Sequence, residues 1–251
     1  CESLASVTIP DSVTSIGFTA FLRCKSLTTI NIPESVTSIG ECAFSGCYSL
    51  TTIDIPERVT SIGLAAFSEC SSLTTINIPE SVTSIGLYAF RHCISLTSVT
   101  IPGRVTSIGD LAFSVCSSLT TINIPERVTS IGYSAFSECR SLTTINIPES
   151  VTSIGLGAFA CCESLRYAII PTNLEDKNES YWTERGINIR RTTLITQEQL
   201  SDWASDNKLS KNYPSHELFV LYQLQKDDSF NPSWPELGKL APNLLMGDLI
   251  R

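Results

Sequence analysis

Hydrophobic residues recur at a fixed step along the first two thirds of the chain. In the stretch from Cys24 to Cys47 they stand at Leu27, Ile30, Ile32, Val36, Ile39, Ala43 and Phe44. The same pattern returns without an insertion at a constant distance, the repeat step, which cysteines mark at Cys1, Cys24, Cys47, Cys70, Cys93, Cys116, Cys139 and Cys162. A fixed period in the twenties is typical of a solenoid, in which each unit is one supersecondary turn stacked on the next.

The spacing within one unit predicts three segments. Leu27 to Ile32 is rich in Thr and β-branched residues and ends at Pro33, which predicts one short strand per coil, parallel to the strand of the next coil. Val36 to Ile39 predicts a second short extended segment. The spacing from Ile39 to Cys47 through Ala43 and Phe44 is i, i+4, i+5, i+8, so it predicts a turn or two of helix after Gly40.

The unit Cys-x-Ser-Leu-Thr-x-Ile-x-Ile-Pro-x-x-Val-Thr-Ser-Ile-Gly-x-x-Ala-Phe-x-x-Cys, as in Cys24 to Cys47, resembles the BspA-like (Treponema pallidum type) leucine-rich repeat family over Cys1 to Pro171. The resemblance implies a leucine-rich-repeat arc with a parallel sheet on its concave side. With the right-handed winding expected of parallel crossovers, the predicted fold class is an α/β repeat solenoid.

Members of that family are commonly bacterial surface proteins that adhere to host matrix or to other cells. The resemblance therefore implies a non-catalytic protein-interaction or adhesion module, at the cell surface or secreted, whose partner is a protein such as a host matrix or cell-surface protein. An intracellular scaffold or regulatory repeat protein in the cytoplasm remains an alternative, because the repeat motif names no ligand.

The repeat fades after Pro171. Trp182 follows Phe159 by one repeat step, and residues 186–190 predict a last strand. We expect a solenoid over 1–170 and, over 171–251, a degenerate closing coil with a helical cap, whose helices lie near 197–208, 216–226, 234–240 and 243–250. The chain opens at Cys1 in mid-repeat, which indicates a fragment of a longer product or a processed one.

Charge and composition narrow the possible partners. Residues 1–170 carry 8 Lys/Arg against 13 Asp/Glu, and residues 171–251 carry 9 against 12, in a chain whose net charge is −8. Neither part is basic, so nucleic-acid binding is not expected. No run of about 18 apolar residues exists, so no membrane span is expected. We expect a monomer.

Ten cysteines raise the question of disulfides and metal. The interval between repeat cysteines contains no C-x-x-C pair, and only His92 and His216 are available as histidine ligands. Parallel neighbours at a strand spacing of about 4.8 Å stand too far apart for a disulfide, which needs about 3.8 Å between Cβ atoms. We expect one buried row of thiols with Cys42 and Cys161 facing outward, and neither a metal nor a cofactor.

No catalytic constellation accompanies the repeat. His92 has no neighbouring nucleophile motif, and the paired carboxylates of the chain fall in loop-like stretches. An enzyme with its site in residues 171–251 remains an alternative, which would require a pocket with perturbed titrating groups there. An ice-binding Thr ladder is a further alternative, although the expected curvature opposes a flat lattice match.

We call the first strand of each coil, Leu27 to Ile32 and its counterparts, the inner strand. The outward positions of the inner strands are mostly Thr and Asn, and large side chains replace them only in the final coil. There Arg166, Tyr167 and Ile169 follow Thr144 and Asn146 of the preceding coil. Aromatic residues and Arg dominate binding energies at interfaces, so we predict a binding site at Arg166, Tyr167, Ile169, Asn146 and Thr144. The alternative is that the tail covers these side chains as part of the cap.

Overall fold

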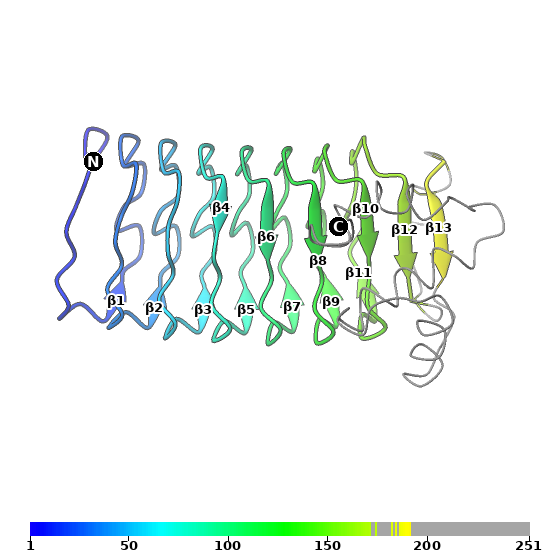
Figure 1. Cartoon of the computed structure of the whole chain (residues 1–251), viewed down its shortest axis with the longest axis horizontal. Helices are drawn as coiled ribbons and strands as arrows, with labels where there is room; N and C mark the ends of the chain where they lie inside the picture. The colour runs from blue at the N-terminus through cyan, green and yellow to red at the C-terminus, as the bar shows by residue number, and fades with distance from the viewer. Residues whose placement is uncertain (172–173, 175–181, 183, 185, 192–251) are drawn as a thin grey trace, which may run out of the picture.

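The computed structural model describes residues 1–171, 174, 182, 184 and 186–191. Successive coils stand side by side in one row, as Figure 1 shows, and equivalent residues of neighbouring coils pair in register. Each coil holds two extended segments and a turn segment. The predicted repeat solenoid with parallel strands is therefore confirmed, but it is a β-solenoid and not the α/β solenoid predicted from the sequence.

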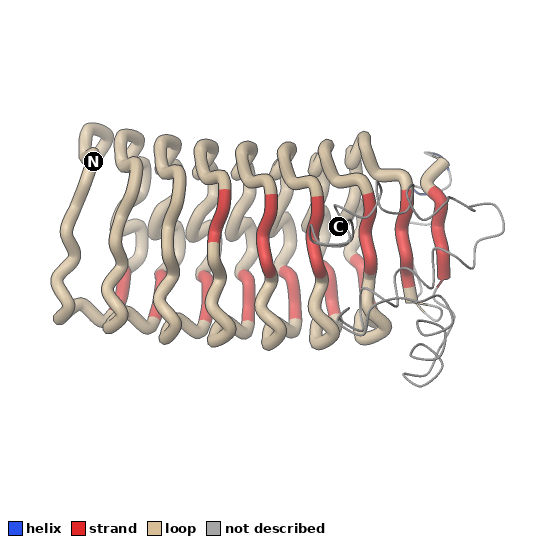
Figure 2. Tube along the Cα trace, viewed as in Figure 1, coloured by secondary structure: helices blue, strands red, loops and turns tan. Residues whose placement is uncertain are grey.

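The Val-Thr-Ser-Ile segments form a 7-stranded parallel sheet in the order β1-β2-β3-β5-β7-β9-β11. Its strands are β1 (Ser15–Ile16), β2 (Ser38–Ile39), β3 (Ser61–Ile62), β5 (Ser84–Ile85), β7 (Ser107–Ile108), β9 (Ser130–Ile131) and β11 (Ser153–Ile154). This is the second extended segment predicted from the sequence, and it runs along the opposite side of the row from the inner strands (Figure 2).

The inner strands form two parallel sheets of three strands each, β4-β6-β8 and β10-β12-β13. They are β4 (Thr75–Ile76), β6 (Ser98–Thr100), β8 (Thr121–Asn123), β10 (Thr144–Asn146), β12 (Tyr167–Ile170) and β13 (Asn188–Arg191). Ser98 pairs with Thr121 at the repeat step, whereas Tyr167 pairs with Asn188, which is closer in sequence than a full step. The last strand predicted at residues 186–190 is thus present, one coil after β12.

The core consists of columns of identical side chains that run through the coils. The phenylalanines stack from Phe21 to Phe159 with neighbouring ring centroids 5.2 to 5.5 Å apart. Trp182 ends this column, 5.3 Å from Phe159 and fully buried. The sequence prediction that Trp182 takes the place of a phenylalanine is therefore confirmed.

The helix predicted after Gly40 and its counterparts is not formed, and residues 1–171 contain no helix. In the fourth turn segment the N–H groups of Tyr88, Phe90 and His92 donate to carbonyl groups of the next coil at 2.8 to 3.0 Å. Tyr88 and His92 have positive φ, 60° and 61°, which turns alternate peptide groups toward the neighbouring coil. An α-helix is about 10 Å wide and does not fit coils stacked at a strand spacing of about 4.8 Å.

The predicted arc is also corrected. A leucine-rich-repeat arc needs one side of each coil to be wider than the other, and helices normally supply that width. Here backbone hydrogen bonds join neighbouring coils both at the strands and at the turn segments, so neither side opens to the width of a helix. The row is nearly straight in Figure 1.

The predicted tail helices near 197–208, 216–226, 234–240 and 243–250 lie outside the described residues. The division of the chain into 1–170 and 171–251 stays a prediction. Among the residues that the structure describes, no helix is long and apolar enough to cross a membrane.

Candidate functional site

The solenoid presents three long faces to solvent. The Thr-Ser face consists of Thr14 and Ser15 and their counterparts at each repeat step, up to Thr152 and Ser153. The Thr-Asn face consists of the outward positions of the inner strands, which are Thr29 and Asn31 and their counterparts at each repeat step. The turn face consists of residues 18, 19, 22, 23 and 25 and their counterparts at each repeat step, up to 156, 157, 160, 161 and 163.

The five residues predicted as a binding site lie together on β10, on β12 and, for Arg166, directly before β12, and their exposure differs. Arg166 is exposed, Tyr167 and Asn146 are half-buried, and Ile169 and Thr144 are buried. The guanidinium of Arg166 donates to the carbonyl groups of Glu163 and Leu165 at 2.8 and 3.0 Å. Thr144 pairs with Tyr167 and Asn146 with Ile169 across the two strands. A binding role for these residues stays a prediction.

The turn face carries the features that the sequence prediction did not assign. All large apolar side chains that are exposed among the described residues lie on it: Phe18, Leu22, Ile94, Tyr133 and Leu156. Leu156 is 62% exposed and Tyr133 is 52% exposed, on adjacent coils of the same row. Exposed apolar side chains that gather on one face mark an interaction surface more often than scattered ones do.

The turn face can be located from the sequence by comparing the coils with one another, because its residues vary from coil to coil. The Val-Thr-Ser-Ile-Gly segment is identical in seven coils, from Val13 to Gly17 through Val151 to Gly155. The residue after that glycine is Phe18, Glu41, Leu64, Leu87, Asp110, Tyr133 or Leu156. The Thr-Ser face is also largely exposed and yet does not vary. Exposure alone therefore does not account for the variation of the turn face.

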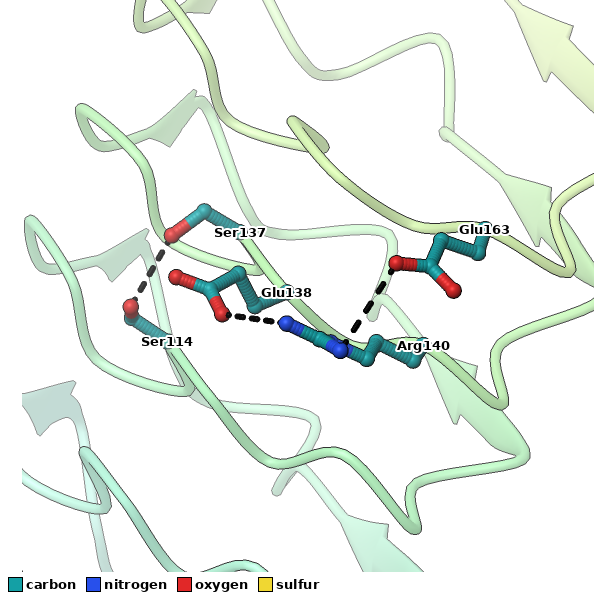
Figure 3. Close-up of polar contacts among 5 residues, drawn as sticks. All are labelled: Ser114, Ser137, Glu138, Arg140 and Glu163. Atoms are coloured by element: carbon teal, nitrogen blue, oxygen red, sulfur yellow. Dashed lines mark hydrogen bonds and ion pairs between the residues drawn. The ribbon is translucent and has the colours of Figure 1, made fainter.

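The polar side chains of the turn face pair with one another over neighbouring coils, as Figure 3 shows. Arg140 lies between two carboxylates, 3.1 Å from Glu138 and 3.7 Å from Glu163. Ser114 and Ser137 share a buried hydrogen bond of 2.9 Å. The ion pairs are exposed and so contribute little to stability, but they fix the orientation of the arginine.

Earlier along the same face, the hydroxyl of Tyr48 donates to Glu69 at 2.9 Å, and the pKa of Tyr48 is raised by that carboxylate. The guanidinium of Arg91 lies 5.8 Å from the ring centroid of Tyr88, within the range of a cation–π interaction. His92 is half-buried in its left-handed turn. These contacts hold side chains in place, and none of them forms a nucleophile and base pair.

All ten cysteines have free thiols. Cys24 and its counterparts up to Cys162 are buried and Cys161 is exposed, as predicted, whereas Cys42, predicted to face outward, is half-buried. Cys1, which the repeat places in the buried row, is exposed in this structure. Within the described residues, no group of three or more His, Cys, Asp or Glu side chains is arranged to hold a metal ion.

Each buried thiol from Cys47 onward donates to the carbonyl group of a phenylalanine of the preceding coil, at 3.1 to 3.3 Å. Burial raises the pKa of the Cys47 thiol to about 12. Burial likewise raises the pKa of Cys93 well above its usual value, and the neighbouring Cys116 adds to the shift. These thiols stay protonated near neutral pH and have no nucleophilic role.

The coils have parallel strands in their walls and columns of leucine, isoleucine and phenylalanine in their core. Together with the repeat sequence, this architecture defines a leucine-rich-repeat protein. The model of the BspA type leucine-rich repeat region matches residues 1–118 and 83–204. The chain belongs to that family.

Solved structures similar to this chain include a leucine-rich cell surface protein from Faecalibacterium prausnitzii, with 35% sequence identity and a TM-score of 0.51. The match covers 83% of this chain and 63% of that one, so the chain spans less than two thirds of the length of that relative. The T. pallidum leucine-rich repeat protein is 27% identical with a TM-score of 0.41, and the match covers 66% of this chain and 68% of that one.

The pneumococcal vaccine antigen PcpA is 17% identical with a TM-score of 0.51, and the match covers 82% of this chain and 66% of that one, so it shares the fold. A search of curated proteins found no match.

Proposed function

We propose that this chain is a non-catalytic binding module of a cell-surface protein and that it holds a protein partner on its long solenoid surface. Two observations outside the geometry support the location: the family to which the chain belongs, and the description of the Faecalibacterium prausnitzii relative as a cell surface protein. The partner is a host matrix protein or a protein on another cell.

The observation that carries this proposal is that the exposed large apolar side chains of the described residues all lie on the turn face, two of them, Tyr133 and Leu156, on adjacent coils. Burying such side chains contributes about 1.5 to 3 kcal/mol each when they become fully covered. In the free chain Tyr133 and Leu156 contribute only part of that stabilisation, because both are more than half exposed. Their place on the surface is instead suited to contact with another molecule.

The test uses the full chain with purified matrix proteins, namely fibronectin, laminin and collagen, and with intact epithelial cells. Surface plasmon resonance and cell-binding assays are expected to show saturable binding to at least one of them. The double variant Tyr133→Ser, Leu156→Ser should lose binding at least tenfold while its circular dichroism and melting temperature stay unchanged. Absence of saturable binding to every matrix protein and to cells would contradict the proposal.

A second candidate function, ice binding, gains one observation from the structure. The coils form a nearly straight row, so the curvature expected from the sequence does not bend the Thr-Asn face, whose Thr ladder this function concerns (Figure 1). Against it, Thr74, Thr97 and Thr120, next to outward residues of that face, already donate their hydroxyls to backbone carbonyl groups of the preceding coil at 3.3 Å. Thermal hysteresis of the full chain at millimolar concentration would support this function, and its absence would exclude it.

A further inference from the structure

One row of the turn face has a defined chemical order over four consecutive coils. Its residues are Glu41, Leu64, Leu87 and Asp110, each one repeat step after the last. The two carboxylates are exposed, and the two leucines between them are half-buried. The row therefore presents an apolar centre with a negative charge at each end.

These carboxylates differ from the others of the turn face in their surroundings. Glu138 and Glu163 form ion pairs with Arg140, and Glu69 accepts the hydroxyl of Tyr48. Asp110 accepts only a backbone N–H, that of Tyr133 at 2.7 Å, and neither it nor Glu41 forms an ion pair within the part of the chain that the structure describes. Both ends of the row are thus open to a cation.

The spacing of the row decides which kind of segment fits it. Neighbouring coils carry their phenylalanine rings 5.2 to 5.5 Å apart, and one turn of an α-helix advances about 5.4 Å. An extended chain presents same-side residues about 6.6 to 6.8 Å apart. If it lay along the row, its side chains would shift relative to the coils by more than about 1 Å at each coil. A helix that lies along the row keeps one side chain over each coil.

We propose that the row from Glu41 to Asp110 binds an amphipathic helix of a protein partner that carries basic residues three turns apart and apolar residues between them. In helix positions this is Lys or Arg at i and i+11, with Leu or a similar residue at i+4 and i+7, since those four positions share one face. This inference rests on the proposed function and names the chemistry of the partner. Beyond Asp110 the row continues with Tyr133 and Leu156, which extend its apolar part.

The test measures fluorescence anisotropy of a synthetic amphipathic helical peptide of about 18 residues with Lys at i and i+11 and Leu at i+4 and i+7, mixed with the full chain. We expect saturable binding that weakens as salt is raised. Glu41→Gln with Asp110→Asn should raise the dissociation constant about tenfold or more, and Leu87→Ser should do the same. A peptide with Glu in place of both Lys residues should not bind.

The matched control is the double variant Glu34→Gln, Glu57→Gln, which removes the same charge from exposed glutamates outside the turn face. It should leave peptide binding unchanged. Equal weakening by this control would show attraction of a cationic peptide to an acidic chain, and would overturn the inference. Failure of the peptide to bind would also overturn it, whereas the proposed function fails only if matrix proteins and cells do not bind either.

Discussion

The thiol of Cys93 donates a hydrogen bond of 3.2 Å to the backbone carbonyl group of Phe67, a residue of the preceding coil. The ring of Phe67 in turn stacks on Phe90, 5.5 Å away. The cysteine column and the phenylalanine column are therefore linked from Cys47 onward, and the thiol is a second donor to a carbonyl group that already accepts the backbone N–H of Cys70.

Thiol labelling of the native chain should separate the ten cysteines into two groups. Cys1 and Cys161 are exposed and Cys42 is half-buried, so a thiol reagent should modify these three first. The seven buried cysteines from Cys24 to Cys162 should react only after denaturation, without prior reduction. Mass spectrometry after labelling checks this. Release of further thiols by reductant would contradict the free thiols of the structure.

The stability of the chain should fall at high pH. Burial raises the pKa of Cys47 from 9.0 to about 12, and an unfolded chain loses thiol protons near its usual pKa. Above about pH 9 the folded chain therefore binds more protons than the unfolded one, and the free energy of unfolding decreases by up to about 1.4 kcal/mol per pH unit per thiol. Below that pH this contribution is constant.

Urea unfolding from pH 8 to pH 10.5 measures the effect. The variant Cys93→Ala should show a shallower pH dependence than the parent chain, because one buried thiol is removed. A stability that is flat up to pH 10.5 would show that the thiols do not titrate with unfolding.

The phenylalanine column should dominate the stability of each coil. Phe90→Ala removes a fully buried ring that stacks on both neighbouring coils, and it should cost about 3 to 5 kcal/mol. Phe18→Ala, at a site that is 70% exposed, should cost less than about 0.5 kcal/mol. Urea unfolding compares the two variants, and equal costs would mean that the column does not hold the coils together.

The glycine of the Val-Thr-Ser-Ile-Gly segment should be required for close stacking. A Cβ at Gly109 would lie 2.8 Å from backbone atoms of Gly86 and Leu87, whereas a Cβ at Gly17 would meet nothing within 4 Å. Gly109→Ala should therefore destabilise the chain by about 1 to 3 kcal/mol. Gly17→Ala should be neutral or slightly stabilising. Melting temperatures in parallel test this, and a neutral Gly109→Ala would show that the coils can move apart.

Two adjacent alanines test the left-handed turns. Ala65 has a φ of 50°, while Ala66 is fully buried in the core. Glycine relieves the strain of a positive φ, which is about 1 kcal/mol or more, so Ala65→Gly should be neutral or stabilising. Ala66→Gly should destabilise by about 0.5 to 1 kcal/mol. Chemical denaturation of both variants decides, and the reverse order would contradict the turn geometry.

The sequence period was sufficient to predict the coil, its strands and its buried columns, because a core side chain that recurs at every repeat step has no other consistent packing. It did not predict the turn segment. Ile85, Ala89, Phe90 and Cys93 are all buried, as a helical face requires, but two left-handed residues give the same inward directions. Only Gly46 and Gly157 mark those positions with glycine, so the sequence contained little sign of them.

The site was harder to predict for a related reason. The sequence predicts anchors on the Thr-Asn face, where the family resemblance places the concave sheet, and the large side chains there are Tyr167 and Arg166. The exposed apolar side chains lie on the turn face, for which the sequence spacing predicts a helix. Their exposure depends on backbone geometry that a helical assignment conceals.

The unbroken register of the coils has a consequence for how such a chain changes over generations. Recombination between any two coils removes or adds whole units, and the joined ends meet with the same Phe, Cys and Gly neighbours that they had before. An array can therefore become longer or shorter without a new core. Each such event shuffles the order of the side chains on the turn face, so a new combination of anchors and charges arises in one genetic step.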